Sequence, residues 1–161
     1  MAHESIIDRW VKKLSNDDES QERASKILVK ELNEDLRDEL ILAMELEAES
    51  EHLLYEHLAK KIRNIAHAKR EQAEIIEKLI IELGGEVDKK EIQLYVAKPD
   101  GQFKEILKLE AGLSARLVEQ LNTAEDGGLH DAAKTLIGLK NEHNNHLEAI
   151  ENVIMKVNAS L

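Results

Sequence analysis

The sequence has no cysteine, a single proline and a single tryptophan among its 161 residues. Without cysteine, disulfides, thiolate metal sites and thiol catalysis are all excluded. No apolar run approaches the roughly 20 residues that a membrane-spanning helix needs. The opening Met-Ala-His-Glu-Ser does not have the pattern of a signal peptide. We therefore expect a cytoplasmic protein with no membrane partner.

Basic residues are also scarce relative to acidic ones. The chain has 22 Lys and Arg against 33 Asp and Glu, for a formal net charge of −11. Nucleic-acid binding needs a basic face that neutralises phosphates, so a nucleic-acid partner is not expected. A strongly acidic balance instead suits a soluble particle, or one whose function tolerates cations.

Helix breakers are few and are concentrated at a few points. Three of the seven glycines lie between Gly84 and Gly101, beside Pro99, and two more are Gly127 and Gly128. The remaining segments are rich in Leu, Ile, Ala, Glu and Lys, which favour helices. The length suffices for one domain with one sizeable core. The composition therefore predicts an all-α protein built of long helices.

The N-terminal segment predicts a short amphipathic helix over residues 4–14. The apolar residues of one face are Ile6, Ile7, Trp10, Val11 and Leu14. The polar run 15–22 is typical of a loop, in which Ser20 is a candidate N-cap for the next helix. We thus divide the chain into an N-terminal helix and loop, 1–19, and a bundle, 20–161. A helix this short is not stable alone, so Trp10 and Ile7 should pack against the bundle or a neighbouring subunit.

A helical pattern then runs from residue 21 to Leu83 without a glycine or proline. One helix of that length would span ~90 Å, too long for a domain of this mass. We therefore expect a turn between Tyr55 and Ala66, where Asn64 is the most turn-prone residue. Gly84-Gly85 ends the second helix in the manner of a glycine C-cap.

The second half predicts another helical hairpin, with helices over about 103–123 and 130–158 joined at Gly127-Gly128. A long connection, 85–101, separates the two hairpins and ends in a turn at Pro99-Asp100-Gly101. A short, a long and a short loop in succession indicate a middle connection that crosses the length of the bundle, as in ferritin-like folds.

The two hairpins resemble each other, as expected of an internal repeat. The segment Lys69-Arg70-Glu71-Gln72 aligns with Lys140-Asn141-Glu142-His143. Residues 32–40 resemble the opening of a bacterioferritin first helix, and residues 65–79 resemble the second helix of rubrerythrin or bacterioferritin. Over roughly 32–158 the chain thus resembles the ferritin-like superfamily. The resemblance implies a four-helix bundle that associates into a homo-oligomer, a dimer or larger.

The resemblance also implies a pattern of metal ligands, from which this chain departs. Members of the superfamily hold two irons by one Glu from each of the first and third helices, and by a Glu-x-x-His pair from each of the second and fourth. The first Glu-x-x-His is replaced here by Lys69 and Gln72, and the second by Lys140 and His143. Glu110 matches the third-helix glutamate, and either Glu39 or Glu47 matches that of the first helix. The bacterioferritin-like alignment favours Glu39, which precedes Gln72 by 33 residues, as Glu110 precedes His143.

Two interpretations of these residues stay open. In the first, Glu110 and His143 are ligands of a rearranged iron or manganese site, because they lie about equally far from Gly127-Gly128 and should face each other. The full candidate set is Glu39, Glu47, Glu110, Glu142, His143 and His146. In the second, no metal binds, because charged lysine is almost never a ligand.

The second interpretation assigns the lysines to the glutamates that remain. Lys69 and Lys140 would supply the positive charge that buried glutamates need, and Lys140 should lie inside the bundle, paired with Glu110. A bacterioferritin-like haem is not expected in either case, because Arg70 stands where the resemblance requires the methionine that ligates haem.

Three functions follow from these alternatives. In the first, the chain is a ferritin-like bundle with an atypical or degenerate di-metal site and a structural or interaction role. In the second, it is an active di-iron or di-manganese oxidase, or an iron-handling protein, with a rearranged site. In the third, it is a helical interaction domain unrelated to iron. The sequence does not decide whether the chain is an enzyme.

Overall fold

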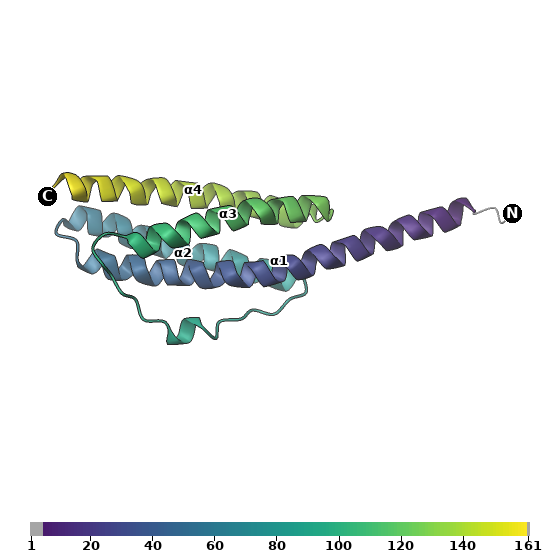
Figure 1. The fold of residues 1–161 in the computed structure, drawn as a ribbon, viewed down its shortest axis with the longest axis horizontal. Coiled ribbons are helices and arrows are strands. Elements are labelled where there is room, and N and C mark those ends of the chain that lie inside the picture. The colour runs from purple at the N-terminus through teal and green to yellow at the C-terminus, as the bar shows by residue number, and fades with distance from the viewer. Residues whose placement is uncertain (1–4, 161) are drawn as a thin grey trace.

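The computed structural model describes residues 5–160 and contains four long helices and one short 3-10 helix. The long helices are α1 (Ile6–Glu51), α2 (Glu56–Glu82), α3 (Lys104–Asp126) and α4 (His130–Ala159). The short helix η1 (Ile92–Leu94) lies in the connection between α2 and α3. No strand occurs within residues 5–160. The predicted all-α four-helix architecture is confirmed (Figure 1).

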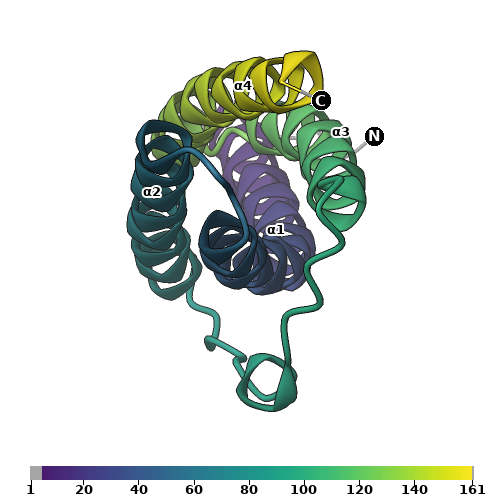
Figure 2. The ribbon, with the colours of Figure 1, turned by 90° about the vertical axis from the view of Figure 1, so that its left-hand side faces the viewer.

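The four helices form a closed ring when viewed along the bundle. In this ring α1 packs against α2 and α3, while α4 packs against α2 and α3. Within the described part of the chain, α2 and α3 lie on opposite corners, as do α1 and α4 (Figure 2). Because α2 and α3 run in the same direction, the chain must return along the whole bundle to join them. The predicted crossing by residues 85–101 is confirmed (Figure 1).

The first helix is longer than predicted, because the loop expected over 15–22 is helical. The prediction of a separate helix over 4–14 is therefore wrong for the described residues. The segment 15–22 is polar, but it contains no glycine or proline, so polarity there removes burial without breaking the helix. The helix begins at Ile6 because Ser5 and Asp8 form a reciprocal capping box. That residues 1–19 and 20–161 are separate units stays a prediction.

The N-terminal part of α1 projects beyond the bundle as an arm (Figure 1). We define the arm as residues 6–19, all of which are exposed. Ala24 is the first buried residue of α1, and the α3–α4 turn seals the bundle there. A Cβ on Gly127 would lie 2.5 Å from the Cβ of Ala24, so only glycine fits this approach. The predicted packing of Trp10 and Ile7 against the chain's own bundle is therefore wrong.

The α1–α2 turn lies at residues 52–55, just before the expected interval, and Asn64 is inside α2. Asn64 does not end the helix because its neighbours Ile62 and Ile65 are core residues, and their packing outweighs the weak helix propensity of one asparagine. The other boundaries agree with expectation. Gly84 adopts a φ of 81°, as the predicted glycine C-cap of α2 requires.

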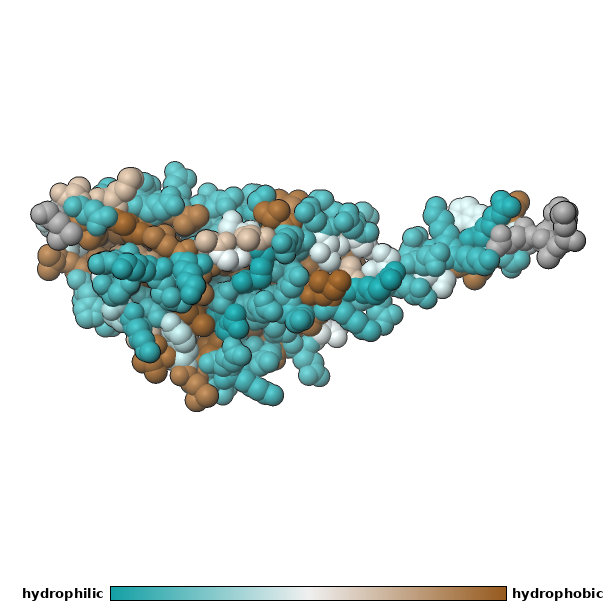
Figure 3. Space-filling view, viewed as in Figure 1, coloured by the Kyte–Doolittle hydropathy of each residue, from teal (hydrophilic) through white to brown (hydrophobic). Residues whose placement is uncertain are grey.

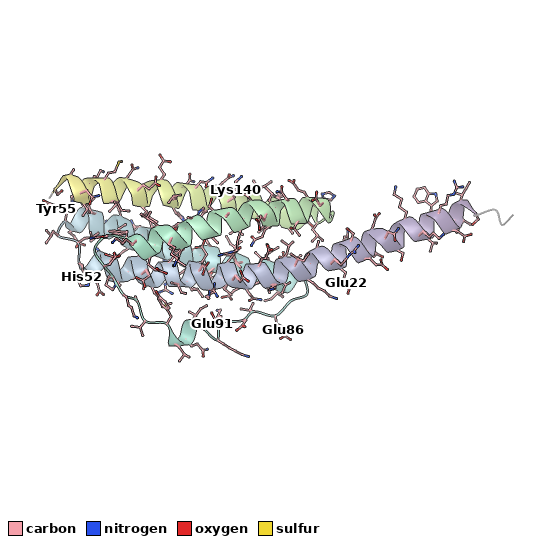
Figure 4. The ribbon with its side chains drawn as sticks, viewed as in Figure 1. Glu22, His52, Tyr55, Glu86, Glu91 and Lys140 are labelled. Atoms are coloured by element: carbon pink, nitrogen blue, oxygen red, sulfur yellow. The ribbon has the colours of Figure 1, made fainter. Side chains whose placement is uncertain are left out.

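The crossing connection is fastened to α1 by side chains, since it has little secondary structure of its own. Asn33 binds the start of the connection through its side-chain amide. Its Nδ2 donates to the Glu86 carbonyl at 3.0 Å, and its Oδ1 accepts from the Asp88 amide at 2.8 Å. Farther along, Glu45 accepts from the Tyr95 hydroxyl and, at 3.1 Å, from the Lys98 amide. Figure 4 labels Glu86 and Glu91 in this connection, which passes outside α1.

Glu49 anchors the end of the connection, accepting from the amides of Asp100 at 2.9 Å and Gly101 at 3.2 Å. Glu45 and Glu49 are both buried.

No helix within residues 5–160 is long and apolar enough to cross a membrane.

Replacing Glu45 should destabilise the fold because it removes the acceptor of two donors. We expect Glu45→Ala to lower the free energy of unfolding by about 1–3 kcal/mol, the cost of stranded buried donors. Glu47→Ala is the matched control: Glu47 pairs with Arg70 at the surface of the same helix and should change it by ~1 kcal/mol or less. Urea unfolding measures both, and equal effects would contradict the anchoring role of Glu45.

Candidate functional site: a buried polar centre

A cluster of polar side chains lies in the bundle interior, and each long helix contributes to it. Glu39 comes from α1, Lys69 from α2, Glu110 from α3 and His143 from α4. Lys69 and Glu110 are both 0% exposed, and the other two are also buried. Each of these polar side chains lies within the row of buried apolar side chains on the inner face of its helix. On α2, for example, Lys69 lies between the buried residues Ile62, Ile65 and Ile76.

The Lys69 ammonium occupies the middle of this cluster. Its Nζ lies 2.7 Å from Glu110 Oε1 and 3.7 Å from Glu39 Oε2. On the other side of Glu110, His143 Nδ1 lies 2.8 Å from Oε2. The positions of Glu110 and His143 agree with the expectation that they face each other across the α3–α4 hairpin. Of the two candidates on α1, Glu39 is the one that reaches the centre.

Burial and the neighbouring side chains together determine the charge of the two carboxyl groups. Burial raises the pKa of Glu39 to about 8, although the positive charge of Lys69 opposes this. Burial would also raise the pKa of Glu110, but the contact with His143 and the charge of Lys69 bring it below its ordinary value. At neutral pH Glu39 therefore retains its proton, whereas Glu110 is a carboxylate in contact with the Lys69 side chain.

Several polar atoms of the centre lack a hydrogen-bond partner among the described residues. They include Oε2 of Glu39, Oε1 of Gln72, Nε2 of His143 and Nδ1 of His146. Gln72 and His146 are buried beside the cluster. Burial and the nearby Lys69 charge lower the pKa of His146 to about 4, so its imidazole is neutral.

The remaining candidate residues lie outside the centre. Glu47 pairs with Arg70 on the surface, with Oε2 2.9 Å from the guanidinium. Glu142 is half exposed, and its Oε2 is 3.7 Å from His146 Nε2. Lys140 is partly exposed and has no ion pair among those found in residues 5–160, so its predicted pairing with Glu110 is wrong. Figure 4 labels Lys140 on α4.

Helix register explains why Lys69 is central and Lys140 is not. In α2 the buried residue before Gln72 precedes it by three positions and is Lys69. In α4 the buried residue before His143 precedes it by four positions and is Leu139. Each residue turns the helix by about 100°, so this difference moves Lys140 to the flank of α4. The internal repeat thus aligns the sequences of α2 and α4, but it does not determine how far each helix is rotated about its own axis.

A second buried network lies one turn along α1, and the sequence analysis missed it. Arg116 of α3 binds Asp35 at 2.7 Å and also binds Asp38, while the Gln120 amide donates to Asp35 at 2.6 Å. Burial raises the pKa of Asp35 to about 6, against the effect of Arg116 and Gln120. The signal was available, since Asp35 and Gln120 stand in the apolar stripes of their helices.

The sequence pattern of the ferritin-like domain matches residues 29–160. The chain belongs to the ferritin-like domain family. The matched region contains α2, α3, α4 and the part of α1 from Val29 onward, and it leaves out the arm. No curated protein and no solved structure gives a significant match to the chain.

The residues at the centre do not fit the two-iron site that the ferritin-like family implies. Lys69 brings an ammonium to within 2.7 Å of Glu110, so a cation bound at this carboxylate would be repelled. Gln72 offers a neutral amide where the pattern has histidine. Among residues 5–160, no group of three or more His, Asp or Glu side chains converges as a metal site. That any of the six candidate residues ligates a metal stays a prediction.

Removing Lys69 should strand the Glu110 carboxylate. We expect Lys69→Met to lower the free energy of unfolding by about 3–5 kcal/mol, and Lys69→Met with Glu110→Gln to recover much of that loss. Lys140→Met is the matched control from the repeat-related position and should have little effect. Chemical denaturation of the four proteins measures this. If Lys140→Met were as damaging as Lys69→Met, the assignment of Lys69 as the central cation would fail.

The two glutamates should respond differently to neutralisation. Glu39→Gln resembles the neutral form present at pH 7 and should cost little, whereas Glu110→Gln strands Lys69 and should cost about 3–5 kcal/mol. The raised pKa means that folded Glu39 retains a proton that the unfolded chain releases, so wild-type stability falls as pH rises from about 4.5 to 8. Stability of wild type relative to Glu39→Gln should fall by at most about 1.4 kcal/mol per pH unit. Parallel stability curves would contradict this.

Proposed function

We propose that this chain is a ferritin-like bundle whose di-metal site is degenerate, and that its role is structural or in binding other chains rather than in oxidation. The position of Lys69 supports this proposal most directly. Its ammonium is fully buried, 2.7 Å from Glu110, and is the positive charge that the buried carboxylate needs. A cation is therefore not required for the charge balance of this interior.

The surrounding residues give further support. An oxidase of this family needs ligands with free lone pairs aimed at two metal ions. Lys69 and Gln72 provide an ammonium and an amide at the two positions contributed by α2. Glu142 is directed to the surface and Glu47 is engaged by Arg70, so neither supplies a substitute ligand to the centre.

Metal analysis of the purified protein tests this proposal. We expect far less than one equivalent of iron, manganese or zinc per chain after growth in metal-supplemented medium, and no saturable Co(II) absorption band on titration. Lys69→Glu combined with Gln72→His replaces the ammonium and amide by the carboxylate and imidazole of the family pattern. That variant should gain Co(II) and Fe(II) binding.

The matched control for this gain is Lys134→Glu with Ile137→His, which adds the same side-chain types three residues apart on the exposed side of α4, outside the centre. About two equivalents of iron or manganese in the native protein would overturn the proposal in favour of an oxidase or iron-handling protein. In that case Lys69→Met would also alter the metal content, which separates a true centre from adventitious surface binding.

A further inference from the structure

The arm of α1 presents large apolar side chains to solvent. Ile6 and Ile7 are each 73% exposed, Trp10 is 63% exposed, and Val11 and Leu14 are each 59% exposed. Figure 3 shows the arm as a narrow rod projecting from a much thicker body. Nothing else in residues 5–160 covers this face, because all of residues 5–19 are exposed. Apolar surface of this extent on one helical face is typical of an interaction site.

This face is the continuation of the face that α1 buries in the bundle. Trp10 precedes Leu28 by eighteen residues, and Leu14 precedes Leu32 by the same interval. Eighteen residues are five turns at about 3.6 residues per turn, so these side chains point in the same direction. Leu28 and Leu32 are 0% exposed. The arm thus extends a core-forming stripe beyond the point where the chain's own helices can cover it.

Charge along α1 changes sign between the tip and the base of the arm. The tip, 6–14, carries three basic residues and one acidic residue, namely Arg9, Lys12, Lys13 and Asp8. The next segment, 15–22, carries four acidic residues and no basic residue: Asp17, Asp18, Glu19 and Glu22. Figure 4 labels Glu22 where α1 leaves the bundle. Two such arms are complementary when they run antiparallel, because each basic tip then meets an acidic base.

Apolar surface on the bundle agrees with the same alignment. An arm that places its residue 12 beside residue 19 of a second copy carries Ile6 and Ile7 to the end of that copy's bundle. Two exposed isoleucines lie at this end, Ile27 at 49% and Ile81 at 64% exposure. Ile81 is near the end of α2, where Gly85 packs on Val29 of α1. This arrangement therefore pairs the opposite charges of the two arms and brings Ile6 and Ile7 to exposed apolar side chains of the partner's bundle.

We propose that the arm binds a second copy of this chain, with the two arms antiparallel and each tip lying on the base of its partner. The resulting interface is isologous, so association stops at the dimer. The proposal goes beyond the proposed function and stands without it, because the arm lies outside the polar centre and contacts none of its residues.

Three measurements on the full chain test the association. Light scattering should give a dimer for wild type and a monomer for Leu14→Glu, which places a charge on the apolar face. Met155→Glu, which alters an exposed apolar residue of α4 at the far end of the bundle, should remain dimeric. Trp10 is the only tryptophan, so its emission should shift to shorter wavelength on dimerisation in wild type and not in Leu14→Glu. Unchanged far-UV circular dichroism of Leu14→Glu shows that the chain still folds.

Single cysteines report the orientation, because the natural sequence has none. Lys12→Cys mixed with Glu19→Cys should form the mixed disulfide several-fold faster than either protein forms its own. Faster cross-linking of Lys12→Cys with itself would indicate parallel arms and overturn the proposal. A monomer at all accessible concentrations, growth beyond the dimer, or a Trp10 shift that appears only with anionic lipid vesicles would overturn it as well. None of these outcomes depends on the metal content.

Discussion

This bundle depends on one buried ion pair, formed by Lys69 and Glu110 in the interior. Moving an ammonium and a carboxylate out of water costs several kcal/mol for each, and the cost is offset only if the two groups stay in contact. Lys69 and Glu110 are supplied by α2 and α3, which lie at opposite corners of the bundle. Their contact therefore spans the interior, and it is correct only when all four helices are assembled in the right register.

The buried acids of α1 organise much of the remaining structure. Asp35 and Asp38 bind Arg116 of α3, and Glu39 lies beside Lys69 of α2. Farther along, Glu45 and Glu49 fasten the crossing connection. Asp35 and Asp38 share Arg116, and Glu45 and Glu49 both bind the connection, because residues three or four apart lie on the same face of a helix. The polar contacts of α1 thus restrict how its neighbours can rotate against it. The leucines and isoleucines supply most of the buried surface.

Sequence reasoning succeeded where a residue type has one local consequence. Glycine pairs end helices, so the second hairpin and the long crossing connection could be predicted from Gly127-Gly128 and Gly84-Gly85, whereas the first hairpin followed from the length of its helical pattern. It failed where the outcome depends on packing. The polar run 15–22 resembles a loop in composition, yet it is helical because nothing in it breaks a helix. Lys69 and Lys140 were equivalent in the repeat, and only the rotation of α4 distinguishes them. The resemblance favoured Glu39 over Glu47, and the structure places Glu39 beside Lys69.

The two ends of α1 give the molecule a polarity along its length. At one end the arm emerges, and at the other α4 finishes at Ala159 beside the α1–α2 turn, where Figure 4 labels His52 and Tyr55. The 46 residues of α1 alone span about 70 Å at 1.5 Å per residue. Anything fused after α4 would therefore be held a whole molecular length from the arm. The two ends of the molecule are therefore distinguishable and lie far apart along one axis.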